Sequence, residues 1–93
     1  MATERSVAAF KKEVRDWAAA VGVQPSRIDV RPMTRKWASC SPKTGRLSFS
    51  LDLMDAPRPL RETVIVHELL HLRLPNHGKL FRRLLSAYLK LVR

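Results

Sequence analysis

The sequence predicts a small α+β domain: an N-terminal helix, a three-stranded antiparallel sheet and then two further helices. Two observations lead to this prediction. Apolar residues recur at helical spacing near both ends of the chain, whereas the middle alternates apolar and polar residues between proline- and glycine-containing turns. The 93 residues give room for one modest core, so we expect a single domain over residues 1–93.

The first helix is predicted to end at Val21, because Gly22 is suited to the position just after a helix. A single stripe of apolar side chains runs along this segment at spacings of three and four: Val7, Phe10, Val14, Trp17, Ala18 and Val21. Charged residues occupy the opposite side. We expect the stripe to cover the sheet that follows.

Three short strands are predicted next. Ile28 and Val30 alternate with polar residues in the first, residues 36–40 form the second, and residues 46–51 form the third. Residues 41–45 contain a proline and a glycine and are typical of a hairpin loop.

The third strand should present one apolar and one polar face to its surroundings. Its inward residues are Leu47, Phe49 and Leu51, and its solvent-facing residues are Arg46, Ser48 and Ser50. Such a sheet also leaves an edge strand, with which an extended peptide could pair.

The next helix, predicted for residues 58–74, contains the sequence His67-Glu68-Leu69-Leu70-His71. A spacing of four leaves the two histidines only about 40° apart around a helix, so both rings can bind one ion. Glu68 lies beside the first ring, where its carboxylate can reach a water on that ion. Because burying these polar groups without partners would be costly, the sequence predicts a metal site.

His77 is the expected third ligand. A hydrolytic zinc site usually takes three protein ligands and leaves the fourth position to water. The chain has no Asp or Glu after Glu68, and Pro75 and Asn76 favour a turn that returns His77 to the ion. We therefore expect Zn²⁺ to be held by His67, His71 and His77.

The last helix is predicted for residues 78–93. Its inward positions are apolar: Phe81, Leu84, Leu85, Tyr88, Leu89 and Val92. Its outer face is basic and contains no acid: Lys79, Arg83, Lys90 and Arg93, with Arg82 beside them. We expect this face to contact DNA or another polyanion, and the alternative is a solvated face that only aids solubility.

Overall charge and cysteine content agree with a nucleic-acid-rich, reducing environment. The net charge of +10, from 18 Lys and Arg against 8 Asp and Glu, favours polyanionic neighbours. Cys40 is the single cysteine and cannot form an internal disulfide, so a cytoplasmic setting is expected. No apolar run has the length of a membrane span, and we expect no membrane contact; the oligomeric state stays open.

Three segments carry a resemblance to a known family: RPMTRKWASCS (31–41), GRLSFSLDLMDAP (45–57) and VIVHELLHLRLPNHGKLF (64–81). Together they resemble the YgjP-like and SprT-like zinc metallopeptidases, a compact branch of the zincins. The resemblance implies a zinc metallopeptidase with four site residues, namely the zinc ligands His67, His71 and His77 and the catalytic general base Glu68. By analogy with SprT-like relatives, its protein or peptide substrates would include proteins on DNA.

The hairpin segment of the resemblance places Trp37, Ser39 and Cys40 beneath the site. Two positions depart from the family pattern. Ala38 replaces the usual glycine, and Arg82 stands where an aromatic residue often follows Phe81.

Two other functions remain open. A divalent ion beside many arginines could instead hydrolyse a nucleotide phosphoanhydride. A basic nucleic-acid-binding module with structural zinc would need Cys40 as its fourth ligand. For the peptidase, the residues whose chemistry suits stabilisation of the oxyanion are Tyr88, Arg35 and Lys36.

Overall fold

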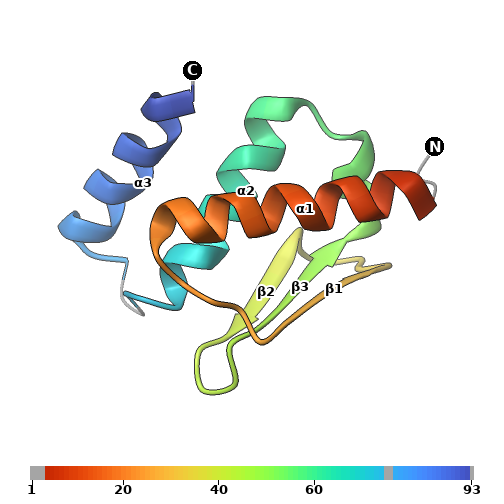
Figure 1. Cartoon of the computed structure of the whole chain (residues 1–93), viewed down its shortest axis with the longest axis horizontal. Helices are drawn as coiled ribbons and strands as arrows, with labels where there is room; N and C mark the ends of the chain where they lie inside the picture. The colour runs from red at the N-terminus through yellow and green to blue at the C-terminus, as the bar shows by residue number, and fades with distance from the viewer. Residues whose placement is uncertain (1–3, 75–76, 93) are drawn as a thin grey trace.

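The computed structural model describes residues 4–74 and 77–92 and places three helices on one side of a small sheet (Figure 1). The elements in chain order are α1 (Glu4–Val21), β1 (Arg27–Arg31), β2 (Ala38–Ser41), β3 (Arg46–Ser50), the 3-10 helix η1 (Leu51–Asp55), α2 (Arg58–His71) and α3 (Lys79–Val92). The predicted α+β class and order of the main elements are therefore confirmed.

The sheet is mixed, so the prediction of three antiparallel strands was wrong. Its strand order is β1-β3-β2, with β3 parallel to β1 and antiparallel to β2. The predicted β2–β3 hairpin forms, but β1 pairs with the far side of β3. The connection 32–37 crosses the end of β3, where the Ser50 amide donates a hydrogen bond to the Trp37 carbonyl at 2.8 Å.

As the central strand, β3 is buried on both of its faces. Leu47 and Phe49 belong to the core on the helix side. Ser48 and Ser50 lie on the outer face but are only 5% and 1% exposed, because strands flank β3 on both sides. The expected solvent exposure of these two serines was therefore wrong. Leu51, expected to end the strand, begins η1 instead.

Helix α1 covers the sheet with the predicted apolar stripe. Phe10, Val14, Trp17, Ala18 and Val21 are buried, and the rings of Phe10 and Phe49 meet edge-to-face at a centroid distance of 5.1 Å. Polar contacts join α1 to α2 and to the segment just after it. Arg61 pairs with Glu13 at 2.9 Å, and Arg73 donates to the Val21 carbonyl, satisfying a group at the helix end.

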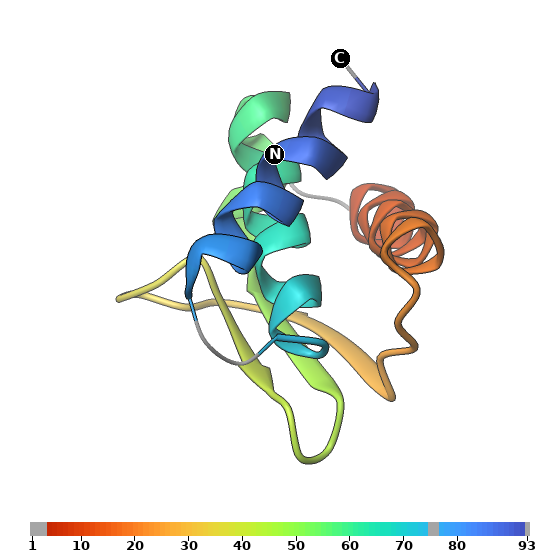
Figure 2. The same ribbon diagram turned by 90° about the vertical axis from the view of Figure 1, so that its left-hand side faces the viewer.

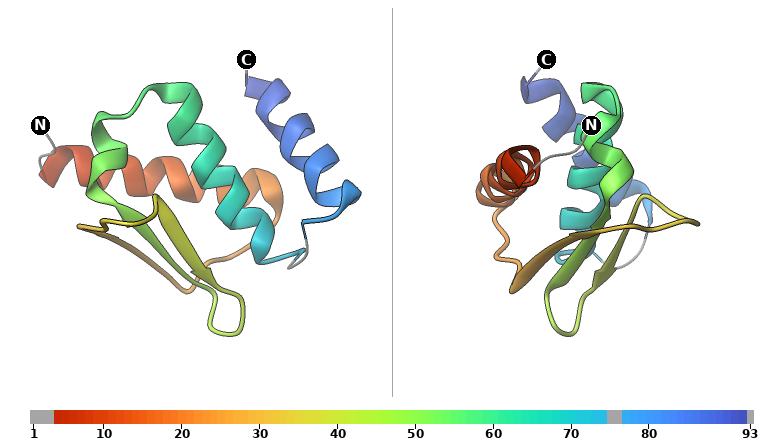
Figure 3. Two further views of the ribbon diagram at one scale, coloured as in Figure 1. Left: turned by 180° about the vertical axis from the view of Figure 1, so that it is seen from behind. Right: turned by 90° about the vertical axis from the view of Figure 1, so that its right-hand side faces the viewer.

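Helix α2 is the central helix of the three, with α1 on one side and α3 on the other (Figures 2 and 3). Its Ile65, Val66, Leu69 and Leu70 are fully buried. It ends at His71, earlier than the predicted residue 74, although the Leu74 amide still bonds the Leu70 carbonyl at 2.7 Å. None of the helices in the described ranges has the length and apolar character needed to cross a membrane.

Candidate metal centre

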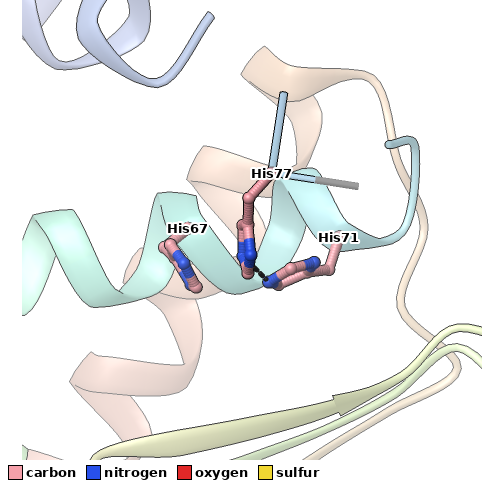
Figure 4. A group of neighbouring side chains, drawn as sticks. All are labelled: His67, His71 and His77. Carbon is pink, nitrogen blue, oxygen red and sulfur yellow. Dashed lines mark hydrogen bonds between the residues drawn. The ribbon is translucent and has the colours of Figure 1, made fainter. Parts of the chain in front are cut away.

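Three histidine rings converge where α2 ends and α3 begins (Figure 4). His67 and His71 project from the same side of α2, with ring centroids 4.7 Å apart. The ring of His77 reaches them from the segment before α3, with centroids 5.0 Å and 4.4 Å away. One ligand nitrogen from each ring lies within 4.8 Å of the other two, so the structure brings the three predicted ligands together. The predicted turn at Pro75 and Asn76 lies outside the described residues.

The spacing and chemistry of these nitrogens fit a metal ion. A tetrahedral ion with bonds of about 2.0–2.1 Å to nitrogen needs ligand atoms about 3.3 Å apart. The Nε2 atoms of His71 and His77 are 2.8 Å apart, and no pair in the group exceeds 4.8 Å. Small side-chain rotations therefore suffice to reach that spacing. Imidazole nitrogens suit zinc and other first-row transition metals, so the donor set agrees with the geometry.

Glu68 lies beside the histidines and is only 8% exposed. Its Oε1 is 3.1 Å from Nδ1 of His67. When Nδ1 carries the ring proton, it donates to this carboxylate and leaves the Nε2 lone pair for an ion. Glu68 is thus placed to orient a ligand, a contact that the residue spacing alone did not predict.

Comparison with known families agrees with this arrangement. The profile of the family described as YgjP-like, metallopeptidase domain, matches residues 1–93, the whole chain. The chain belongs to the YgjP-like metallopeptidase family. No curated protein matches it. The family is one of metallopeptidases, and the three histidines of this YgjP-like domain lie close enough together to hold one metal ion.

Phe81 of α3 forms an apolar wall behind the histidines of the YgjP-like domain. It is 2% exposed, and its ring centroid lies 5.3 Å from that of His67, 5.1 Å from that of His71 and 4.8 Å from that of His77. Sequence analysis placed Phe81 in the core but not at the site. The available signal was its place near the start of the helix that follows His77, four residues after this ligand.

Cys40 of β2 approaches the same centre from the sheet. Burial, together with a smaller effect of the negative charge of Glu68, raises the pKa of its thiol to about 11. Its sulfur is not part of the metal-binding group found among the described residues, which consists of the three histidines. The structure therefore does not bring Cys40 into place as a fourth ligand.

The other predicted site residues of the YgjP-like domain lie elsewhere. Trp37 is 43% exposed, so its expected packing beneath the site was wrong, and Ser39 lies on the outer face of the sheet. Arg35 and Lys36 are exposed in the connection before β2, while Tyr88 packs against the core. None of the last three has a described contact with the histidines or Glu68.

Proposed function

We propose that this YgjP-like domain is a zinc metallopeptidase that hydrolyses peptide bonds. His67, His71 and His77 hold the ion, and Glu68 is the general base. The observation that carries the proposal is the convergence of three imidazole nitrogens within 4.8 Å beside a buried carboxylate. When bound, Zn²⁺ supplies Lewis acidity, which polarises the scissile carbonyl and makes water easier to deprotonate.

Glu68 performs the proton transfers. Its carboxylate accepts a proton from the attacking water, whose oxygen forms the new bond to the carbonyl carbon. As the carbon–nitrogen bond breaks, the carboxylic acid returns that proton to the leaving amine. The contact between Glu68 and His67 Nδ1, at 3.1 Å, supports this role because it fixes the carboxylate next to the ion's ligands.

The substrate lies along β2 as an extended peptide. Within the described part of the chain, strand β2 pairs only with β3, which leaves its other edge with backbone groups available for pairing. It also packs against α2, the helix that carries Glu68 and two of the histidines. The His67 side chain is 37% exposed, so the site is open to solvent.

The basic face of α3 provides a contact for DNA or another polyanion that would bring DNA-associated proteins to the site. Its residues in the described range are exposed and have no carboxylate partner there: Lys79, Arg82, Arg83 and Lys90. Arg93, predicted to belong to this face, lies outside the described residues. A single unpaired thiol at Cys40 suits a reducing cytoplasm, where we place the protein.

Cleavage of an unfolded protein by the purified, zinc-loaded chain and by its Glu68→Gln variant tests the proposal. We expect the variant to lose about 10²–10⁴-fold in rate, the usual contribution of a general base, while metal analysis finds unchanged zinc. Glu13→Gln is the matched control. It makes the same change of side chain, but at the contact between α1 and α2. It should keep the wild-type rate.

Three results would contradict the proposal. Cleavage that persists in Glu68→Gln would show that Glu68 is not the general base. Release of phosphate from nucleoside triphosphates that is lost in Glu68→Gln, without proteolysis, identifies a phosphohydrolase instead. Loss of most zinc affinity in Cys40→Ser identifies a structural site with a fourth ligand.

A further inference from the structure

The face of the sheet turned away from the helices carries a polar hollow that the metal centre does not use. Its volume is about 290 Å³, and its lining comes from all three strands: Arg31, Ser39, Cys40, Ser41, Arg46 and Ser48. The register explains which side chains meet there. Ser48 of β3 lies directly between Ser39 of β2 and Asp29 of β1. Because side chains alternate along a strand and Leu47 and Phe49 face the helices, Ser48 and its neighbours across the sheet face away from them.

Three serine side chains line this hollow, and their hydroxyls have no hydrogen-bond partner among the described residues. The Oγ atoms of Ser39, Ser41 and Ser48 neither donate nor accept a hydrogen bond within the ranges 4–74 and 77–92, although the Ser41 carbonyl accepts one from the Thr44 hydroxyl at 3.5 Å. Ser48 is 5% exposed as a residue, but no fully buried side-chain nitrogen or oxygen in the described ranges lacks a partner, so its hydroxyl reaches solvent in the hollow. A ligand with acceptor oxygens would supply the bonds that the protein does not.

The charges around the hollow are positive. Arg31 has no carboxylate partner among the described residues. Arg46 uses its Nε to bind Asp29 at 2.9 Å, which leaves its terminal nitrogens available. Asp29 is the acid of this face, and Arg27 also binds it at 2.9 Å. The single negative charge of Asp29 is thus outnumbered by the positive charges of Arg27, Arg31 and Arg46.

We propose that this hollow binds a phosphate group. Arg31 and Arg46 contact its negative charge, and the serine hydroxyls donate hydrogen bonds to its oxygens. A guanidinium group suits this partner because its fork of N–H groups matches two phosphate oxygens at once. The proposal does not depend on the peptidase activity, because the hollow lies on the opposite face of the sheet from the core and α2. A small metabolite and a nucleic-acid strand offer the same group, and separate probes distinguish them.

The test is a titration of the full-length, zinc-loaded protein with sodium phosphate, followed by NMR at constant ionic strength. We expect saturable shifts of the backbone amides of Ser39, Ser41 and Ser48. The double variant Arg31→Gln/Ser48→Ala should bind phosphate about tenfold or more weakly, because it removes one charged and one neutral donor. Arg15→Gln is the matched control, since Arg15 is an exposed arginine on α1 and its replacement lowers the net charge equally. It should leave the dissociation constant within about twofold.

The carrier of the phosphate is identified by repeating the titration with adenosine monophosphate and with a short oligothymidylate. Tighter binding by one of them at the same amides supports the proposal and names the source. Either of two results overturns it. One is equal weakening by Arg15→Gln and by Arg31→Gln/Ser48→Ala, which indicates general attraction to a protein of net charge +10. The other is binding that leaves the amides of Ser39 and Ser48 unshifted. Unchanged melting temperatures of both variants show that any loss of binding is not unfolding.

Discussion

The thiol of Cys40 lies between the sheet and Glu68, and this position controls its reactivity. Burial raises its pKa from an ordinary 9.0 to about 11. Only the thiolate is nucleophilic, so at pH 8 the reactive fraction is about a hundredfold smaller than for an unperturbed thiol. We expect iodoacetamide to alkylate the native protein about a hundred times more slowly than the same chain unfolded in urea. Mass spectrometry of timed samples measures both rates, and equal rates would contradict the burial of this thiol.

Individual site residues differ in how far the sequence reveals them. His67, His71 and His77 could be predicted as one group, because helical spacing fixes the first two and a lack of downstream acids favours the third. The contact of Glu68 with His67 Nδ1 could not, since it depends on the rotamers of two adjacent side chains. Trp37 was misplaced. The resemblance of its hairpin segment suggested a position beneath the site, but the connection that carries Trp37 passes over the open end of β3 and leaves the side chain exposed.

At the level of elements, helices were predicted more reliably than strand pairing. The apolar stripes of α1 and α3 follow from local spacing, and the structure buries Phe10, Val14 and Phe81 as expected. Alternation in β1 predicts which side chains share a face, but it contains no information on the neighbouring strand or its direction. The parallel pairing of β1 with β3 is decided by the path of the 32–37 connection and by packing under α1. Both are tertiary effects.

The start of α3 should stabilise the metal centre through Phe81. Replacing this 2% exposed ring by alanine should lower the free energy of unfolding by about 3–5 kcal/mol, because it leaves a cavity against three histidine rings. Phe81→Leu keeps most of the apolar volume, so it should fold but bind zinc more weakly than wild type. Leu80→Ala is the control on the same helix. Because Leu80 is 58% exposed, this substitution should change the free energy of unfolding by less than about 0.5 kcal/mol. Urea unfolding and zinc titration measure the two quantities, and equal effects at both positions would refute this role.

Across the whole molecule, the residues proposed for acid-base chemistry and the exposed basic residues lie on different surfaces. The histidines and Glu68 lie on the helix side of the sheet, next to the core. The basic residues of α3 and the hollow bordered by Arg31 and Arg46 are exposed on other surfaces. Surfaces of one charge sign attract polyanions over distances limited by salt. Under the proposals above, a polyanion would bind these basic surfaces, whereas a peptide would pair with the edge of β2.

The bound metal should also hold α3 against the rest of the fold. Helix α3 packs mainly on α2, and an ion held by the proposed ligands would join His77, just before α3, to His67 and His71 of α2. A ligand present at a hundredfold excess over its dissociation constant stabilises the native state by ~2.7 kcal/mol. For a domain of this size, chelation of the ion should therefore lower the melting temperature by roughly 10–20 °C. Hydrogen exchange should rise most in α3 and least in the α1 stripe, which packs against the sheet independently of the ion. The variant His77→Ala should melt at the same temperature with and without chelator. Equal exchange in α1 and α3 after chelation would show that the ion does not fasten α3.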